Sequence, residues 1–549
     1  MKKILPLLAL LALAAMPAWA VDYFWTNSAA DNDFTNWANW TPAPTTWTGN
    51  HNWVVDKIGA DKAQLLAGQS VALERNVYVG DTFGESGEFL MAGGTLDISR
   101  NLRVGRNQST GAFNMSGGTI TAGYGLFVGQ TNSVGALTIS GGTVTVSSVT
   151  TDGLNVAHQA GGNGTLLISG DGVLTVVTGR AVFSDGAEAV SVLSVTDNGA
   201  LNVDSSFLRF GDKDLTTSTV TIAGSGSVKV AAGSVAFGFG NGSVATLDMS
   251  GGELDAPASF MTFSQGGGSN VTVTLSGGTI NSDRMSFANF GDDPGDPTAD
   301  PPIPPRPRAV ATLDMTGGTI NVVRSGASEA TVTGAFRMGP GDSHLSASGN
   351  AVINTEKFWF ADGGVLTLSG DAAIHAAGST DGINPTFDFS EVEITDGLVL
   401  GRLVVNGGSF SVQGAADPVS AVNYAELLSS AIAAGIITTE VEGAELLAQY
   451  DAGSDLTRLV LSLEPVPVVS PWEDLPEIQG FKMAGIGWIR DAHYPHLFHF
   501  PAGWLMIVAE GATLDGFYGY DFAGGNWFWS RDSLGGWHYN FAAAAWQTW

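Results

Sequence analysis

The 549-residue sequence contains no cysteine, which excludes disulfides, thiolate metal sites and cysteine nucleophiles together. Histidine is scarce, and of eight residues only His493, His496 and His499 cluster. Pro495 and nearby aromatics favour a strand there, in which residues three apart face opposite ways, so we interpret this cluster as packing rather than metal binding. No G-x-S-x-G, H-E-x-x-H or P-loop pattern occurs. We therefore expect no catalysis and no cofactor.

Basic residues are also few, since 23 lysines and arginines face 53 aspartates and glutamates, giving a formal net charge of −30. A surface of that sign repels phosphate backbones, so we expect no nucleic-acid partner. Only 14% of the residues are charged while 74 are glycine, which favours tight turns and uncharged polar faces. The hydrophobic share of 44% is enough to form a core, which argues against disorder.

The N-terminal residues have the pattern of a secretory signal peptide. Lys2 and Lys3 precede an apolar run from Ile4 to Met16, and Ala18-Trp19-Ala20 forms a small-x-small cleavage site. No later segment has about 18 uninterrupted apolar residues, so no transmembrane helix is expected. We predict that residues 1–20 are removed and that the protein is secreted or lies on the outer cell surface.

A repeated Gly-Gly step, first seen in "NMSGGTITAG" at Asn114–Gly123, dominates the middle of the chain. The steps or their equivalents return every 21 to 40 residues, most often every 24 to 29, which indicates a repeat architecture. The marker positions are Gly93, Gly117, Gly141, Gly170, Asp197, Gly224, Gly251, Gly277, Gly317, Gly349 and Gly370.

Each unit holds three short runs in which apolar residues alternate with polar ones. In one unit, Phe113 and Met115 precede the Gly117-Gly118 step and Ile120 follows it. Period-two runs without helical spacing between them predict strands that pair one repeat along, which is a parallel β-helix. We expect about eleven coils over residues 87–414, with the Gly-Gly step as a corner between two faces.

The Gly-Gly-Thr units resemble the β-strand repeats of bacterial autotransporter passenger stalks and related surface proteins, over about Gly87 to Gly414. The resemblance implies a right-handed β-helix with a structural or adhesive role. Its implication for activity is weak, because such stalks serve adhesins, proteases and passive surface layers alike.

Residues 21–86 are rich in tryptophan, with Trp25, Trp37 and Trp40 beside asparagines and Trp47 and Trp53 following. We interpret this segment as a cap over the first coil, because the open end of a solenoid needs covering. A carbohydrate-stacking site is the alternative. The spaced tryptophan and the Asn-Trp step also resemble the opening segment of the same surface proteins.

A proline-rich insertion at residues 290–308 accounts for the 40-residue spacing. Its carboxylates could bind Ca²⁺, although a solvated, proline-stiffened loop is the favoured interpretation. The four carboxylates are Asp292, Asp293, Asp296 and Asp300.

The segment at residues 415–463 is expected to close the other end of the β-helix. Asp417 and Pro418 predict an N-cap and first turn, Gly435 a helix stop, and "ELLAQYD" and "TRLVLSL" a terminal strand pair. Residues 464–478 form a proline-rich linker.

Residues 479–549 form an aromatic module, with 17 aromatic residues in the last 62. Aromatics between glycine turns predict a meander of short strands. This tail is similar to short aromatic tails on other large secreted repeat proteins. It could attach to the cell envelope or to extracellular polysaccharide through Trp488, Trp504, Trp527, Trp529 and Trp537.

Two other functions compete with that of a non-catalytic structural or adhesive stalk. A polysaccharide lyase or glycosidase would need carboxylates and a base on neighbouring coils. Asp248 and Asp314 occupy the same place in their repeats, and Asp255 lies near the first. A binder of ice or crystalline polymer would need threonine ladders. The Thr-x-Thr pieces are Thr119–Thr121, Thr143–Thr145 and Thr331–Thr333.

Overall fold

The computed structural model describes two compact units. One comprises the chain to residue 440 with 446–461, and the other comprises 441–445 with 462–549. Described residues of the first unit lie within 21–291, 306–323, 334–361, 364–376, 386–391, 394–395, 398–399, 402–413 and 423–461. Those toward the C-terminus are 462, 472, 475, 477–478, 481–484, 487–493, 496–500, 503–507, 516–534 and 537–548.

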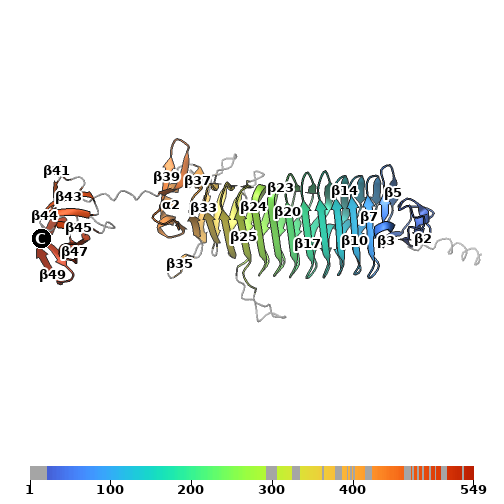
Figure 1. Cartoon of the computed structure of the whole chain (residues 1–549), viewed down its shortest axis with the longest axis horizontal. Helices are drawn as coiled ribbons and strands as arrows, with labels where there is room; N and C mark the ends of the chain where they lie inside the picture. The colour runs from blue at the N-terminus through green and yellow to red at the C-terminus, as the bar shows by residue number, and fades with distance from the viewer. Residues whose placement is uncertain are drawn as a thin grey trace, which may run out of the picture. The chain divides into compact units, whose positions relative to one another are not determined.

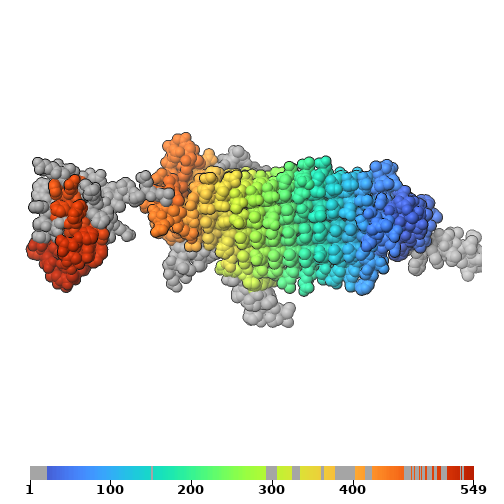
Figure 2. Space-filling model, viewed as in Figure 1, coloured from blue at the N-terminus to red at the C-terminus, as the bar shows by residue number. Residues whose placement is uncertain are grey.

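The first unit is a β-solenoid of about ten turns, which confirms the parallel β-helix expected from the repeats (Figure 1). Each strand pairs in parallel with its counterparts one coil before and after it. For example, all six residues of Thr110–Met115 align with Ser86–Met91 on one side and with Val134–Ile139 on the other. Figure 2 shows the resulting rows of stacked side chains along the shaft.

Three strand columns make up the shaft, and their strands coincide with the runs in which apolar and polar residues alternate. The first column contains β4 (Ala63–Leu65), β7 (Ser86–Met91), β10 (Thr110–Met115), β13 (Val134–Ile139), β15 (Asn163–Ile168), β17 (Val190–Val195), β20 (Thr217–Ile222), β25 (Val310–Met315), β28 (Asp342–Ala347), β31 (Gly364–Leu368), β36 (Arg402–Val405) and β38 (Ile437–Thr438). The second contains β5 (Ser70–Leu73), β8 (Thr95–Ile98), β11 (Thr119–Ala122), β18 (Ala200–Val203), β21 (Ser227–Val230), β26 (Thr319–Val322), β29 (Val352–Thr355), β32 (Ala373–Ala376) and β37 (Ser409–Gln413). The third contains β1 (Asp22–Trp25), β3 (Asn52–Val55), β6 (Val77–Val79), β9 (Asn101–Val104), β12 (Gly125–Gln130), β19 (Leu208–Phe210), β22 (Ser234–Phe237), β27 (Ala335–Met338), β30 (Lys357–Ala361) and β33 (Thr386–Glu391).

Four long strands bend around corners and so belong to more than one column. They are β14 (Thr143–His158), β16 (Val173–Asp185), β23 (Val244–Phe263) and β24 (Asn270–Phe287). Short elements outside the columns are η1 (Trp37–Asn39), β2 (Trp40–Thr41), η2 (Gly59–Asp61), β34 (Ile394–Thr395) and β35 (Leu398–Val399).

The core consists of the inward residues of the three columns, as the alternation predicts. Phe113, Met115 and Ile120 are buried in one coil. Phenylalanines of successive coils stack along the axis, with ring centroids 4.7 to 5.1 Å apart. The stacked residues are Phe183, Phe210, Phe237, Phe263 and Phe287, and Phe336 and Phe358 continue the column.

The Gly-Gly step forms a corner, as expected, and the second glycine carries the positive φ. Gly118 has φ +94°, and a Cβ there would lie 2.6 Å from the carbonyl oxygen of Gly94 in the preceding coil. That carbonyl accepts a hydrogen bond from the amide of Thr119 at 2.9 Å. A side chain at Gly118 would therefore separate two coils that the backbone holds together.

The N-terminal tryptophans pack inward. Trp25, Trp40 and Trp53 are buried, and Trp40 lies edge-on to the other two at 5.3 and 4.9 Å. Since β1 pairs in parallel with β3 and β3 with β6, coiling begins within residues 21–86. The buried rings cannot stack on a carbohydrate, which leaves Trp37, 38% exposed, and the partly buried Trp47 at this end.

The other end of the shaft is closed by α2 (Tyr424–Ala433) and by β39 (Glu445–Asp451) paired with β40 (Leu456–Ser462). The helix begins later than predicted, because Asn423 accepts hydrogen bonds from the amides of Ala425 and Glu426. Asn423 is thus the N-cap of this helix, and the predicted Asp417 and Pro418 lie outside the described residues. Gly435, with φ +74°, ends the helix as expected. Strand β40 pairs antiparallel to β37, which ends the parallel column.

The C-terminal unit is an antiparallel meander, as the aromatic tail predicted. Beneath one face lie the buried Trp472, Ile489, Leu505, Phe517 and Phe528. The nine strands are β41 (Glu477–Ile478), β42 (Phe481–Ala484), β43 (Gly487–His493), β44 (His496–Phe500), β45 (Gly503–Ile507), β46 (Phe517–Asp521), β47 (Asn526–Ser530), β48 (Trp537–Asn540) and β49 (Ala545–Thr548), with η3 (Asp532–Leu534) before β48.

Among the described residues, no helix is both long enough and apolar enough to cross a membrane.

Candidate functional site

The C-terminal meander exposes aromatic rings on the face opposite its core. Trp504, Trp527 and Trp537 are 49%, 47% and 48% exposed, while Trp529 is partly buried. Trp488 lies on β43, and its side chain is outside the described part. Alternation explains the arrangement, because Phe528 points into the core and its neighbours on β47 point outward. We call this set of outward rings on β45 to β49 the aromatic face.

The rings of the aromatic face brace one another. Tyr518, Trp529, Tyr539 and Trp546 are cross-strand partners on four neighbouring strands. Trp546 lies edge-on to Trp529 at 5.9 Å and to Tyr539 at 5.6 Å. Mutual packing of this kind fixes ring orientation while leaving part of each ring open to solvent. The face is therefore a firm apolar platform.

One end of the meander carries a pocket of about 340 Å³. Trp504 and Phe498 meet edge-on there at 5.7 Å, and Phe481 and Arg490 complete the lining. A volume of about 300 Å³ or more, aromatic walls and one charged group are typical of small-ligand sites.

The shaft carries a second set of planar side chains on its third column, which we call the arginine strip. Guanidinium groups lie over aromatic rings along the strip, where each contact combines ring packing with a cation–π attraction. The pairs are Arg106 on Tyr78, Arg103 on Phe127, Arg209 between Phe207 and Phe239, Arg284 on Phe260, and Arg337 on Trp359, at 3.7 to 5.1 Å.

Where β14 and β16 run through the third column, four side chains from neighbouring coils form an ionic cluster, the Asp185 cluster: Asp152, His158, Arg180 and Asp185. Arg180 donates to Asp152 at 2.7 Å and to Asp185 at 3.4 Å, and His158 Nδ1 lies 3.1 Å from Asp185. Burial disfavours the charged form of Asp185, but the hydrogen bond with His158 and the charge of Arg180 outweigh it and lower the pKa of Asp185. The cluster thus holds an ionised carboxylate.

Replacing Asp185 by asparagine should lower the free energy of unfolding by about 1–3 kcal/mol at pH 7, because the hydrogen-bond partners of Asp185 lose a charged acceptor. Since the pKa of Asp185 is lowered by folding, this stabilisation exists above the unfolded pKa near 3.9 and disappears as pH falls through the folded pKa. Melting curves from pH 3 to 8 should show that the difference in stability between Asp185→Asn and the unaltered protein becomes smaller below about pH 4. Asp204→Asn, at an exposed shaft position, is the control, and an unchanged difference at low pH would contradict the electrostatic explanation.

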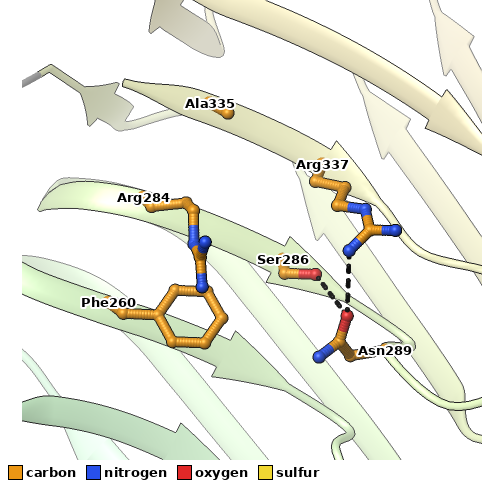
Figure 3. Close-up of a pocket in the computed structure, with 6 residues that line it drawn as sticks. All are labelled: Phe260, Arg284, Ser286, Asn289, Ala335 and Arg337. Atoms are coloured by element: carbon orange, nitrogen blue, oxygen red, sulfur yellow. Dashed lines mark hydrogen bonds between the residues drawn. The ribbon is translucent and has the colours of Figure 1, made fainter. Parts of the chain in front are cut away.

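A smaller pocket of about 40 Å³ lies further along the strip (Figure 3). Arg284 of β24 extends over the ring of Phe260 on β23, with the guanidinium carbon 3.7 Å from the ring centroid. Arg337 of β27 donates to Asn289 Oδ1 at 3.5 Å, and Ser286 donates to the same oxygen at 3.3 Å. Three neighbouring strands therefore place two guanidinium groups beside one pocket.

The carboxylates proposed from sequence do not converge. Asp248 and Asp314 occupy one row of the first column, but Thr274 of the intervening coil separates them. Asp255 accepts a hydrogen bond from Asn281 at 3.1 Å on the second column. Asp292, Asp293, Asp296 and Asp300 lie outside the described residues.

The Thr-x-Thr pieces that the structure describes stack only in short rows. Thr119 aligns with Thr95 and Thr143, and Thr121 aligns with Thr145 and Asp97. The next coil places Val173 beside Thr143, so that row is three threonines long. Thr331–Thr333 lies outside the described part.

No group of three or more histidine, aspartate or glutamate side chains among the described residues is arranged to hold a metal ion. His493 and His496 are cross-strand partners at a hairpin, and His499 is buried.

The arginine strip was not identified from the sequence, although a signal exists. Arg103, Arg209 and Arg337 each stand between two core residues and two places before a glycine, in "LRVG", "LRFG" and "FRMG". The aromatic partners come from other coils or from corners, so the pairing itself depends on register.

Comparisons with protein-family models, with curated proteins and with solved structures find no match to this chain.

Proposed function

We propose that this protein is a non-catalytic secreted or cell-surface stalk whose C-terminal module attaches to carbohydrate of the cell envelope or of an extracellular polysaccharide. The observation that carries the proposal is the aromatic face together with the 340 Å³ pocket beside Trp504. The apolar C–H face of a sugar ring packs on an aromatic ring, and a half-exposed, braced tryptophan presents such a surface at little entropic cost.

The shaft supports the structural half of the proposal. Its inward positions are filled by apolar side chains through successive coils, and both ends are covered, by the buried tryptophans and by α2 with β40. Such a rod resists local opening because each coil is held by two neighbours. The leader pattern from Lys2 to Ala20 and the Gly-Gly-Thr repeats are the grounds for placing it outside a bacterial cell, as an autotransporter-like stalk.

Trp504→Ala, Trp527→Ala and Trp537→Ala should each weaken carbohydrate binding about tenfold, since about 1.4 kcal/mol of ring contact is lost. The measurement is depletion of the full-length protein by microcrystalline cellulose, chitin and isolated cell envelopes. Phe83→Ala is the matched control, because Phe83 is an aromatic residue 71% exposed on the shaft.

Retention of full binding by all three tryptophan variants would overturn the attachment role of the aromatic face. Deleting residues 471–549 adds a second arm to the same assay. Loss of envelope retention with that deletion supports an anchor, and loss of cellulose or chitin binding supports a glycan-binding module.

A second candidate function, that of a polysaccharide lyase, rests on the Asp185 cluster. The cluster brings two carboxylates, an arginine and a histidine together on one face, which is the set of residues that such chemistry needs. Arg180 is paired with both carboxylates inside the cluster, which favours a structural role for these residues over a catalytic one. Turnover of polygalacturonate by the purified protein, abolished in Asp185→Asn, would establish the enzyme instead.

A further inference from the structure

Arg284 differs in its partners from other arginines of the strip and of the Asp185 cluster. Arg106 is paired with Asp81 at 2.9 Å, Arg180 with Asp152 and Arg209 with Asp212 at 2.9 Å. Among the residues that the structure describes, the guanidinium of Arg284 has the ring of Phe260 as its contact and neither a hydrogen bond nor an ion pair. A guanidinium that has no counterion among the described residues is unexpected on a protein of net charge −30.

The surroundings of Arg284 are electrostatically unfavourable for it. Burial lowers the pKa of Arg284, and the like charge of Arg337 lowers it further, while Asp283 opposes them more weakly. Arginine stays charged in proteins, so the lowered pKa reflects the cost of holding this charge partly buried and beside a like charge, and not deprotonation. The Arg284 guanidinium is therefore held near a second guanidinium at a cost that a bound anion would relieve.

Among the described side chains that line the pocket, hydrogen-bond donors outnumber acceptors. Arg284, Arg337 and Ser286 all present donors, and the side-chain amide oxygen in the lining, Asn289 Oδ1, already accepts from two of them. None of the described side chains that line the pocket is acidic. An occupant that offers several acceptor atoms and negative charge is the complement of this lining.

We propose that the pocket formed by Arg284, Ser286, Asn289 and Arg337 binds an oxyanion, either a carboxylate or a sulfate group. Its volume of about 40 Å³ exceeds the roughly 10–15 Å³ that holds one water molecule, so a group of a few heavy atoms fits. A planar guanidinium matches both oxyanions by paired N–H donors. The source of the group is either a free ion or the acidic substituent of a sugar chain lying on the shaft. The site belongs to the shaft and does not depend on attachment through the aromatic face.

The test measures binding of three probes to the full-length protein by calorimetry at low salt: sodium sulfate, a galacturonate oligomer and a sulfated oligosaccharide. Arg284→Met removes the charge while keeping an apolar stem over Phe260, and it should weaken binding at least tenfold. Arg100→Met is the matched control, because Arg100 lies over Tyr124 at 5.5 Å outside the pocket, and it should leave affinity unchanged.

Asn289→Asp is the second variant, and it keeps both arginines. Its carboxylate would occupy the position of the ligand charge, so binding should be lost while the melting temperature is kept or raised. Binding of all three probes identifies a general oxyanion site, and binding of only the galacturonate or only the sulfated oligomer identifies the sugar substituent. Failure of all three probes to bind, or equal binding by Arg284→Met and the unaltered protein, would overturn the proposal whatever the aromatic face does.

Discussion

Replacing Phe237 by alanine is expected to lower the free energy of unfolding by about 3–5 kcal/mol, the cost of deleting a fully buried aromatic ring. Phe237 is 0% exposed and stacks between Phe210 at 4.7 Å and Phe263 at 5.1 Å. Both neighbours are held by their own coils, so they cannot collapse into the space that the ring leaves. The loss of unfolding free energy should therefore lie at the upper end of that range.

The destabilisation caused by Phe237→Ala should also spread to neighbouring coils along the axis rather than across the shaft. Coils contact their immediate neighbours, so a cavity in one coil weakens two interfaces. Hydrogen exchange should show reduced protection first in β19, β22 and β23, together with a lower urea midpoint. Phe83→Ala, on an exposed ring, should change neither. Uniform loss of protection over all coils would contradict this local picture.

The sequence predicted the strand columns well because their signal is local and repeated. Met115 and Ile120 align with Ile139 and Val144, which have the same place in the next coil. The ladder must align equivalent residues in this way if inward positions are to stay apolar. The corner follows from the same step, since glycine alone adopts positive φ at no steric cost.

The arginine strip could not be predicted in the same way, because its contacts join residues of different coils. Arg337 lies over Trp359 and Arg284 over Phe260, from strands whose register is set by corners and insertions of varied length. Arg180 reaches Asp152 across 28 positions, and the register shifts between Val146 and Leu154 bring the two together. Such pairings depend on the irregular parts of each coil.

The start of the capping helix shows a related limit. Asp417-Pro418 is a strong local signal for a helix N-terminus, yet Asn423 is the residue whose side chain accepts from the first-turn amides. The two candidate caps, Asp417 and Asn423, lie close together in the sequence. Burial of Tyr424 and Leu428 against the shaft core favours the later one. Local propensity offers the choices, and packing decides among them.

Replacing Gly135 by alanine should destabilise the shaft by about 3 kcal/mol, the upper range for overpacking in a filled core. Gly135 lies in register between Gly111 and Gly164 on the first column. A Cβ at Gly135 would lie 2.2 Å from both the carbonyl oxygen of Val104 and the amide nitrogen of Gly129. Both atoms belong to the backbone and are held by the ladder and the turn, so neither can yield without opening the coil.

The matched control for Gly135 uses the same row in a later coil, where the chain has Ser191, Ser218 and then Ala245. Ala245→Gly should cost about 0.5–1 kcal/mol, the entropic penalty of glycine within a strand. Urea unfolding of both variants gives the comparison. Similar costs would mean that glycine is used at residue 135 merely because a small residue suffices. A severalfold larger loss of stability at Gly135 would mean that the turn before the first column differs between early and late coils. The coils would then share one strand ladder but differ in the geometry of their corners.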